Sequence, residues 1–218
     1  MTAFWRRFLG ALCIGGALCG GAVAEAASLS AADRNDVAQI EAYLNATSTV
    51  QARFTQTNPD GSVVGGEARL SRPGKLRLDY DPPTPIQVIA DGRFLIYYDK
   101  ELKQASWLGL DETPAGILVR PNVSLNGSLI AVKSVQRNGD AVSVRMEQTG
   151  QPELGEMTMT FDRDPLLLRQ WIVKDQEGKI TTVVLSDIKT GVRLSNDLFV
   201  FENPEFSDPL DRGRGRGR

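Results

Sequence analysis

The group of side chains that comes closest to a catalytic arrangement consists of four aspartates near one another in the sequence: Asp79, Asp81, Asp91 and Asp99. Two carboxylates that face one cleft about 5–10 Å apart can serve as the acid and the base of a hydrolase. The sequence pattern, however, puts Asp79 on the polar face of a strand and places Asp81 and Asp91 in turns. A carboxylate-based periplasmic hydrolase is therefore a weaker interpretation of this sequence than a protein without catalytic groups.

Other common catalytic groups are missing from the part of the chain expected to be the mature protein. The sequence has no histidine, and both cysteines, Cys13 and Cys19, lie in the N-terminal apolar segment. Each follows a leucine, where bacterial lipidation requires a small residue, so neither is expected to carry a lipid. Without that segment, no Ser-His-Asp triad, Cys-His pair, or histidine- or cysteine-ligated metal site can form. We therefore expect a protein that is not an enzyme and needs no metal and no cofactor.

The N-terminal segment has the features of a secretory signal peptide. Arg6 and Arg7 give it a positive start, residues 8–23 are apolar or glycine, and small residues precede a cleavage position near Ala24. Such segments are removed on export, and this one is short and glycine-rich for a membrane-spanning helix. Residues 1–24 are thus predicted to be cleaved, which would leave a periplasmic chain without a stable membrane anchor; an uncleaved anchor is the minor alternative.

The charge of the remaining chain argues against nucleic acid as its main partner. Removing Arg6 and Arg7 from the 25 basic residues leaves 23 against 27 acidic ones, a net charge of −4, whereas nucleic-acid-binding proteins carry basic surfaces. The exception is the tail 211–218, which ends in the repeat RGRGRGR and is predicted to be disordered. An incidental flexible tail is favoured over a segment that contacts anionic lipid head groups or nucleic acid.

The centre of the chain, Glu67–Asp99, predicts three consecutive strands. Apolar Leu76, Leu78 and Tyr80 alternate with charged residues, which gives one apolar and one charged face. The predicted strands cover residues 76–80, 86–90 and 94–98, separated by a group of prolines and by an Asp-Gly hairpin turn. Arg72 is the unusual residue here, because it places a permanent charge where the chain turns into an apolar strand.

A helix is predicted before this region. Ser30 and Asp33 match a capping box, and Val37, Ile40 and Leu44 then recur on one helical face. The helix could simply cover a sheet, or it could be a movable lid over an apolar concavity.

A second, short helix is predicted after Thr113 and Pro114, residues that favour an N-cap and a first helical position. It carries Ile117 and Leu118, which look exposed, and Pro121 ends it.

The rest of the chain has a period of two, with hairpin turns such as Asn138-Gly139. Further strands are predicted to begin at Val50 and to cover residues 102–110, 129–136, 142–148, 157–161, 166–173, 180–185 and 198–201, with Gly65-Gly66 as a break. The predicted fold class is mainly β with two or three short helices (α+β), built on a single curled antiparallel sheet of about ten strands.

Such a sheet would enclose more room than two short helices can fill. The residues expected to face inward are Phe54, Leu76, Leu78, Tyr80, Ile86, Val88, Phe94, Ile96 and Met159. An apolar cavity suits an acyl chain, because each buried methylene contributes about 0.8 kcal/mol. A filled sandwich core would have the same alternation, so the pattern leaves both possibilities open.

An ordered set of motifs resembles the periplasmic carriers of outer-membrane lipoproteins, the LolA-type family, over roughly Val37 to Asp208. The motifs are Phe54-Thr55-Gln56, RPGKLRLDY at residues 72–80, Pro85 with VIADG at residues 88–92, Tyr97-Tyr98-Asp99, Gln104, and Phe199-Val200-Phe201 with Pro204. We assign residues 28–210 to this domain.

The resemblance implies an incomplete β-barrel with a helical lid over a hydrophobic cavity. It implies a monomeric chaperone that receives triacylated lipoproteins from an inner-membrane ABC-type exporter and passes them to an outer-membrane receptor. Arg72 matches the family arginine that closes the lid by hydrogen bonds to lid backbone. The residues expected to contact acyl chains are Val37, Ile40, Leu44, Phe54, Leu76, Leu78, Tyr80, Val88, Ile96, Ile117 and Leu118. A carrier or sensor of other periplasmic lipids on the same fold is the alternative.

Overall fold

A computed structural model describes residues 29–114, 116–125 and 127–202, so the predicted signal peptide and the basic tail lie outside the described residues. The described part contains eleven strands in one antiparallel sheet. They are β1 (Thr49–Thr57), β2 (Val63–Ser71), β3 (Lys75–Tyr80), β4 (Ile86–Asp91), β5 (Phe94–Asp99), β6 (Gln104–Gly109), β7 (Ile130–Asn138), β8 (Ala141–Gln148), β9 (Glu156–Arg163), β10 (Leu166–Lys174) and β11 (Ile180–Thr190).

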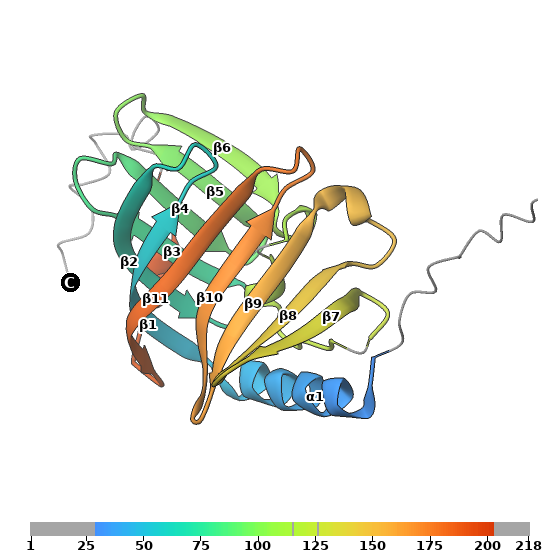
Figure 1. The fold of residues 1–218 in the computed structure, drawn as a ribbon. Helices are drawn as coiled ribbons and strands as arrows, with labels where there is room; N and C mark the ends of the chain where they lie inside the picture. The colour runs from blue at the N-terminus through green and yellow to red at the C-terminus, as the bar shows by residue number, and fades with distance from the viewer. Residues whose placement is uncertain (1–28, 115, 126, 203–218) are drawn as a thin grey trace, which may run out of the picture.

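The sheet curls into a barrel that does not close (Figure 1). Its strand order is β6-β5-β4-β3-β2-β1-β11-β10-β9-β8-β7, so β6 and β7 are its two edges. The mainly β fold and the single antiparallel sheet are confirmed, with one strand more than the ten expected. The Asp91-Gly92 and Asn138-Gly139 turns are also confirmed, with positive φ angles of 108° at Gly92 and 56° at Gly139.

Two details of the predicted strands are wrong. Gly65 and Gly66 do not break the chain, because β2 runs through both. A side chain at Gly66 would collide with the Phe54 ring and the Asp79 carbonyl, so a glycine there allows close packing inside the sheet. The predicted last strand at 198–201 is instead a 3-10 turn, η3 (Asn196–Phe199), which lies against β3 and β4.

Two α-helices, α1 (Ala31–Ala46) and α2 (Gly116–Val119), pack on the concave side of the sheet with the 3-10 turn η1 (Leu110–Glu112) beside α2; a further 3-10 turn, η2 (Pro152–Leu154), follows β8. The predicted capping box of α1 is present, since Asp33 N donates to Ser30 Oγ at 3.1 Å and Ser30 N donates to Asp33 Oδ2 at 2.9 Å. Neither helix in the described ranges has the length and apolar character needed to cross a bilayer.

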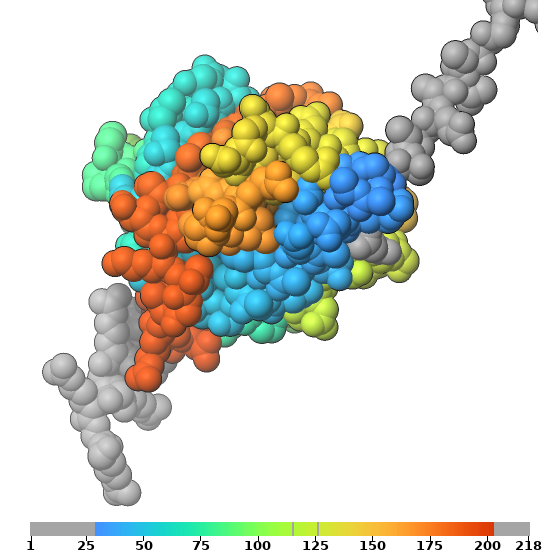
Figure 2. All heavy atoms as spheres, turned by 60° about the horizontal axis from the view of Figure 1, so that its bottom comes forward, coloured from blue at the N-terminus to red at the C-terminus, as the bar shows by residue number. Residues whose placement is uncertain are grey.

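Helix α1 lies across the lower end of the barrel in Figure 1, and Figure 2 brings this end forward, with the atoms of α1 packed among those of the neighbouring strands. The predicted apolar face of the helix is confirmed, because Val37, Ile40 and Leu44 are at most 5% exposed. They join residues from β1 to β4 and β7 to β11 in one core. The concave side of the sheet is therefore the main apolar interior.

Candidate functional site

The interior between the helices and the sheet is apolar and nearly filled. It contains two neighbouring voids of about 30 Å³ each, which share Val50, Leu70, Leu118, Leu168 and Leu185 as lining residues. A volume of this size holds about one water molecule, whereas pockets for drug-sized ligands measure about 300–1,000 Å³. An acyl chain could enter only if side chains now filling this space moved away.

Leu118 of α2 is the one helical residue among the five that line both voids. It is 2% exposed, and Ile117 beside it is 1% exposed. The expectation that these two residues look exposed was therefore wrong, because α2 turns them toward the concave side of the sheet. Displacing Leu118 would enlarge the free apolar space next to both voids.

Two polar side chains of α1 tie this helix to the segment that follows α2. Asn45 Nδ2 donates to the Val123 carbonyl at 2.8 Å, and Val123 N donates back to Asn45 Oδ1 at 2.9 Å. Glu41 Oε2 accepts from Leu125 N at 2.7 Å. Helix α1 and the segment that follows α2 are thus joined by backbone-directed hydrogen bonds, and together they form a lid over the concave side.

The turn between β2 and β3 connects this lid to the sheet. The Arg72 guanidinium donates from Nη1 to the Leu44 carbonyl in the last turn of α1. Two residues on, Gly74 N donates to the Val119 carbonyl of α2 at 2.7 Å. One tight turn therefore holds both helices, in each case through a carbonyl that a helix end leaves without an internal partner.

The Arg72 guanidinium is incompletely satisfied in this position. Its Nε and Nη2 atoms are buried and have no hydrogen-bond partner among the described residues. Burial lowers the pKa of Arg72 below its usual value, although an arginine stays charged in proteins. Arg72 therefore contributes one hydrogen bond to the contact between this turn and α1, although its guanidinium has further donors.

Most residues predicted to contact acyl chains do lie on the concave side. Phe54, Leu76, Leu78, Val37, Ile40, Leu44, Ile117 and Leu118 belong to its buried core, and Tyr80 and Val88 are partly buried against it. Tyr80 packs edge-on against Phe54 with ring centroids 5.1 Å apart. Burial raises the pKa of Tyr80 to about 12, so its hydroxyl remains a neutral donor to Gln56 Oε1 at 2.7 Å.

The structure places Ile96 on the opposite, outer face of the sheet. Ile96 pairs with Ile89, and Ile89 pairs with Arg77, whereas Leu78 pairs with Val88 on the concave side. Paired residues project to the same face, so Ile96 points away from the lid.

Phe94, two residues earlier on β5, shares the outer face with Ile96 and was likewise expected to face inward. The alternation misled the prediction because both faces of β5 are apolar: the outer one is covered by the segment after β11, where the Phe201 ring lies 5.2 Å from Tyr98 and 5.5 Å from Trp107.

The four aspartates of the alternative interpretation do not form a catalytic pair. Asp79 accepts from Arg69 Nη1 at 2.8 Å and from Arg77 Nε at 2.7 Å on the outer face. Asp91 and Asp99 accept backbone N–H groups of their own turns, and Asp81 pairs with Arg53. Each carboxylate therefore has a separate structural partner.

Sequence reasoning missed the lid-bridging residues Glu41 and Asn45 and the void-lining residues Leu70, Leu168 and Leu185. Asn45 had one usable signal, since it is a polar residue next to Leu44 on the predicted helix. Its partner, however, is the backbone of Val123, 78 positions away, which no local pattern indicates.

An unclosed antiparallel barrel with helices packed over its apolar concave side defines the class of fold. Residues 45–202 match the family model described as outer membrane lipoprotein carrier protein LolA. The match covers well over half of the chain, and the protein belongs to the LolA family.

The matches to individual relatives cover most of this chain and most of each relative. The chain is 29% identical over 199 residues to the outer-membrane lipoprotein carrier protein of Alkalilimnicola ehrlichii, covering 85% of this chain and 87% of the relative. It is 27% identical over 183 residues to the protein of the same name from Nitrosomonas europaea, covering 80% and 88%. It is also 26% identical over 187 residues to an uncharacterized protein of Rickettsia prowazekii, covering 85% and 86%.

Proposed function

We propose that this protein is a periplasmic carrier that binds the acyl chains of lipoproteins released from the inner membrane and delivers them to the outer membrane. Its donor would be an inner-membrane ABC-type exporter and its acceptor an outer-membrane lipoprotein receptor. The family membership supports a role as a lipoprotein or lipid carrier, and the relatives named as outer-membrane lipoprotein carriers support a periplasmic location.

The observation that carries the proposal is the apolar interior beneath a lid held by Arg72. Acyl chains entering between the lid and the sheet would replace Leu118 and its neighbours as the filling of that interior. Each methylene removed from water contributes about 0.8 kcal/mol, so a few acyl chains would compensate for opening the lid. When the chains leave, Leu118 and the Arg72 contact to Leu44 would restore the closed form, which favours release to an acceptor.

This mechanism requires no bond-making step. The side chains that act are the apolar residues of the concave side, which bind, and Arg72, which stabilises the closed form. We therefore infer that the protein is not an enzyme, and the separately paired aspartates support that inference.

A lipoprotein-release assay tests the proposal directly. Inner-membrane vesicles that contain the exporter and a labelled triacylated lipoprotein are incubated with the purified protein and ATP. We expect the label to move into the soluble fraction as a one-to-one complex. If no label is released while a known carrier works with the same vesicles, the proposed function is wrong.

Leu76→Glu is the matching variant, because Leu76 lines one void and is 5% exposed. An unpaired buried charge costs several kcal/mol, so release should fall at least about tenfold. Leu102→Glu makes the same substitution at a residue that is 65% exposed and should release lipoprotein like the wild type. Circular dichroism establishes that both variants are folded; a folded Leu76→Glu with normal release would place the acyl chains elsewhere.

A further inference from the structure

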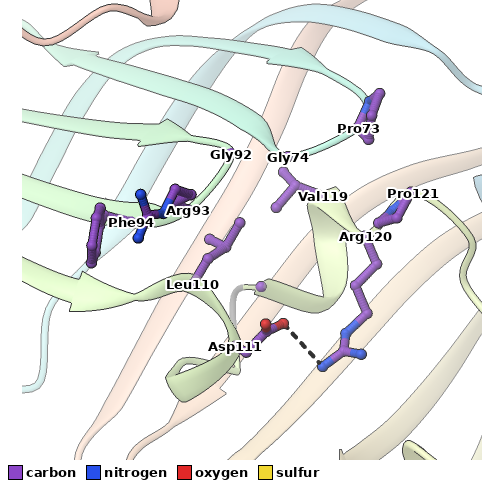
Figure 3. Close-up of a pocket in the computed structure, with 11 residues that line it drawn as sticks. Pro73, Gly74, Gly92, Arg93, Phe94, Leu110, Asp111, Val119, Arg120 and Pro121 are labelled. Carbon is purple, nitrogen blue, oxygen red and sulfur yellow. Dashed lines mark ion pairs between the residues drawn. The ribbon is translucent and has the colours of Figure 1, made fainter.

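A cavity much larger than the two voids lies outside the lid interior. It has a volume of about 580 Å³ and is formed where the β2–β3 and β4–β5 turns meet η1 and α2 (Figure 3). Its lining residues are Pro73, Gly74, Gly92, Arg93, Phe94, Leu110, Asp111, Gly116, Val119, Arg120 and Pro121. This cavity, here called the turn pocket, is large enough for a small organic ligand without any movement of the lid.

The walls of the turn pocket are apolar, with a basic residue on either side. Phe94 and Leu110, which are both partly buried, supply apolar surface, while Figure 3 shows Arg93 beside Phe94 and Arg120 across the pocket. The Arg93 guanidinium lies 5.2 Å from the centre of the Phe94 ring. With Asp111 as the one acidic lining residue, the pocket carries a formal charge of +1.

Arg120 has unused donors at this position. Its side chain is 16% exposed, and its Nε is buried without a hydrogen-bond partner among the described residues. The ion pair with Asp111 spans 3.6 Å from Nη2 to Oδ1, longer than a hydrogen bond, and the Asp111 side chain is 89% exposed. A largely buried guanidinium with one distant partner in solvent is suited to accept an anionic ligand, because charged hydrogen bonds gain strength away from water.

The turn pocket also contacts the apolar core. Val119 is 1% exposed and belongs to the core, and Leu110 is partly buried against it. The hydrogen bond from Gly74 N to the Val119 carbonyl joins two lining residues of the turn pocket. An apolar chain lying on Leu110 would thus rest beside α2, next to the lid.

We propose that the turn pocket binds an anionic single-chain amphiphile, with its phosphate group held by Arg120 and its alkyl chain on Phe94 and Leu110. Arg93 adds a second positive charge at the opposite wall. This inference goes beyond the proposed function, because the ligand differs from the acylated lipoprotein and its site lies outside the lid interior. Either idea can fail without the other.

Calorimetric titration of the full protein tests the proposal. The probes are dodecyl phosphate and dodecyl maltoside, each below its micellar concentration, and inorganic phosphate. We expect dodecyl phosphate to bind the wild type at one site, and Arg120→Gln to weaken this binding at least about tenfold, as expected for loss of a charged hydrogen bond. Arg93→Gln should weaken it by a smaller factor, because Arg93 is exposed. Arg145→Gln, on the outer face of β8, is the matched control and should bind like the wild type.

The two other probes distinguish the sources of binding. The affinity for dodecyl maltoside should be the same in the wild type and in Arg120→Gln. Inorganic phosphate should bind far more weakly than dodecyl phosphate. Equal affinity for inorganic phosphate would reduce the turn pocket to a simple anion site and overturn the amphiphile. The ¹⁵N-edited NMR signal of Arg120 Nε–H keeps the test independent of mutation: it should shift when dodecyl phosphate is added. Unchanged affinity in folded Arg120→Gln, or an unmoved Arg120 signal, would refute the proposal.

Discussion

Replacing Arg72 with leucine should open the lid without unfolding the barrel. The substitution removes the hydrogen bond from Nη1 to the Leu44 carbonyl, and a hydrogen bond from a charged group contributes about 1.5–3 kcal/mol. The free energy of unfolding should therefore fall by about 1.5–3 kcal/mol, little enough for the barrel to stay folded.

The lid equilibrium should shift by the same amount, since only the closed form contains the Arg72–Leu44 contact. A loss of 1.5–3 kcal/mol in the closed form raises the population of the open form at least about tenfold. Hydrogen exchange of the amides in the last turn of α1 should accelerate by that factor, and a hydrophobic dye should bind more. In the lipoprotein assay the variant should still accept cargo but transfer it poorly, because closure no longer competes with the acyl chains.

Two variants make the test specific. Arg72→Lys keeps the charge but not the planar donor group. Its rate of hydrogen exchange in the last turn of α1 should lie between the rates of the wild type and of Arg72→Leu. Arg145→Leu removes an exposed arginine from the outer face of β8 and should leave exchange in α1 unchanged. Unaltered exchange in α1 together with wild-type transfer in Arg72→Leu would refute the role of Arg72 in closing the lid.

Two further predictions concern the interior and the outer face. Leu118→Ala should enlarge the free apolar space next to both voids, lower the free energy of unfolding by about 2–5 kcal/mol in denaturant titrations, and increase binding of a hydrophobic dye; lost stability without more dye binding would contradict the role of Leu118 as the filling that cargo displaces. For Asp79, burial raises the pKa, but hydrogen bonds from Arg77 and Gln87 outweigh it and lower the pKa overall. The contribution of Asp79 to the free energy of unfolding is therefore present above the unfolded pKa of about 3.9, and it is lost as the pH falls through the folded pKa. The stability difference between wild type and Asp79→Asn should be constant above about pH 5 and shrink below about pH 4; a pH-independent difference would contradict this.

The strand pattern was readable from the sequence because each strand with one apolar face has a period of two. β3 illustrates this, since Leu76 and Leu78 are both buried on the concave side as their alternation predicted. The same reasoning failed for Ile96, because β5 is apolar on both faces and alternation alone cannot say which face meets the lid. The outer partner of that strand, the segment with Phe199 and Phe201, is about a hundred residues away in the chain.

Among the lid contacts, too, one could be anticipated from the sequence and the others could not. Arg72 could be singled out because a charge next to an apolar strand needs an explanation, and the structure places its guanidinium on the Leu44 carbonyl. The pairing of Asn45 with Val123 and of Glu41 with Leu125 could not be predicted, because these hydrogen bonds join side chains to backbone across about 80 residues. Backbone acceptors and donors are present at every position, so a sequence carries no mark of which ones are used.

The sequence by itself determined the class of fold, because periodicity and turn residues act locally, and the absence of histidine excluded histidine-based chemistry. It also determined that α1 has one apolar face, at Val37, Ile40 and Leu44. Tertiary structure alone decided which side of the sheet that face covers, how little free space remains around Leu118, and that Arg120 is buried with an unused donor. Those properties depend on distances between segments far apart in the chain, and such distances exist only once the sheet has curled and the lid has packed against it.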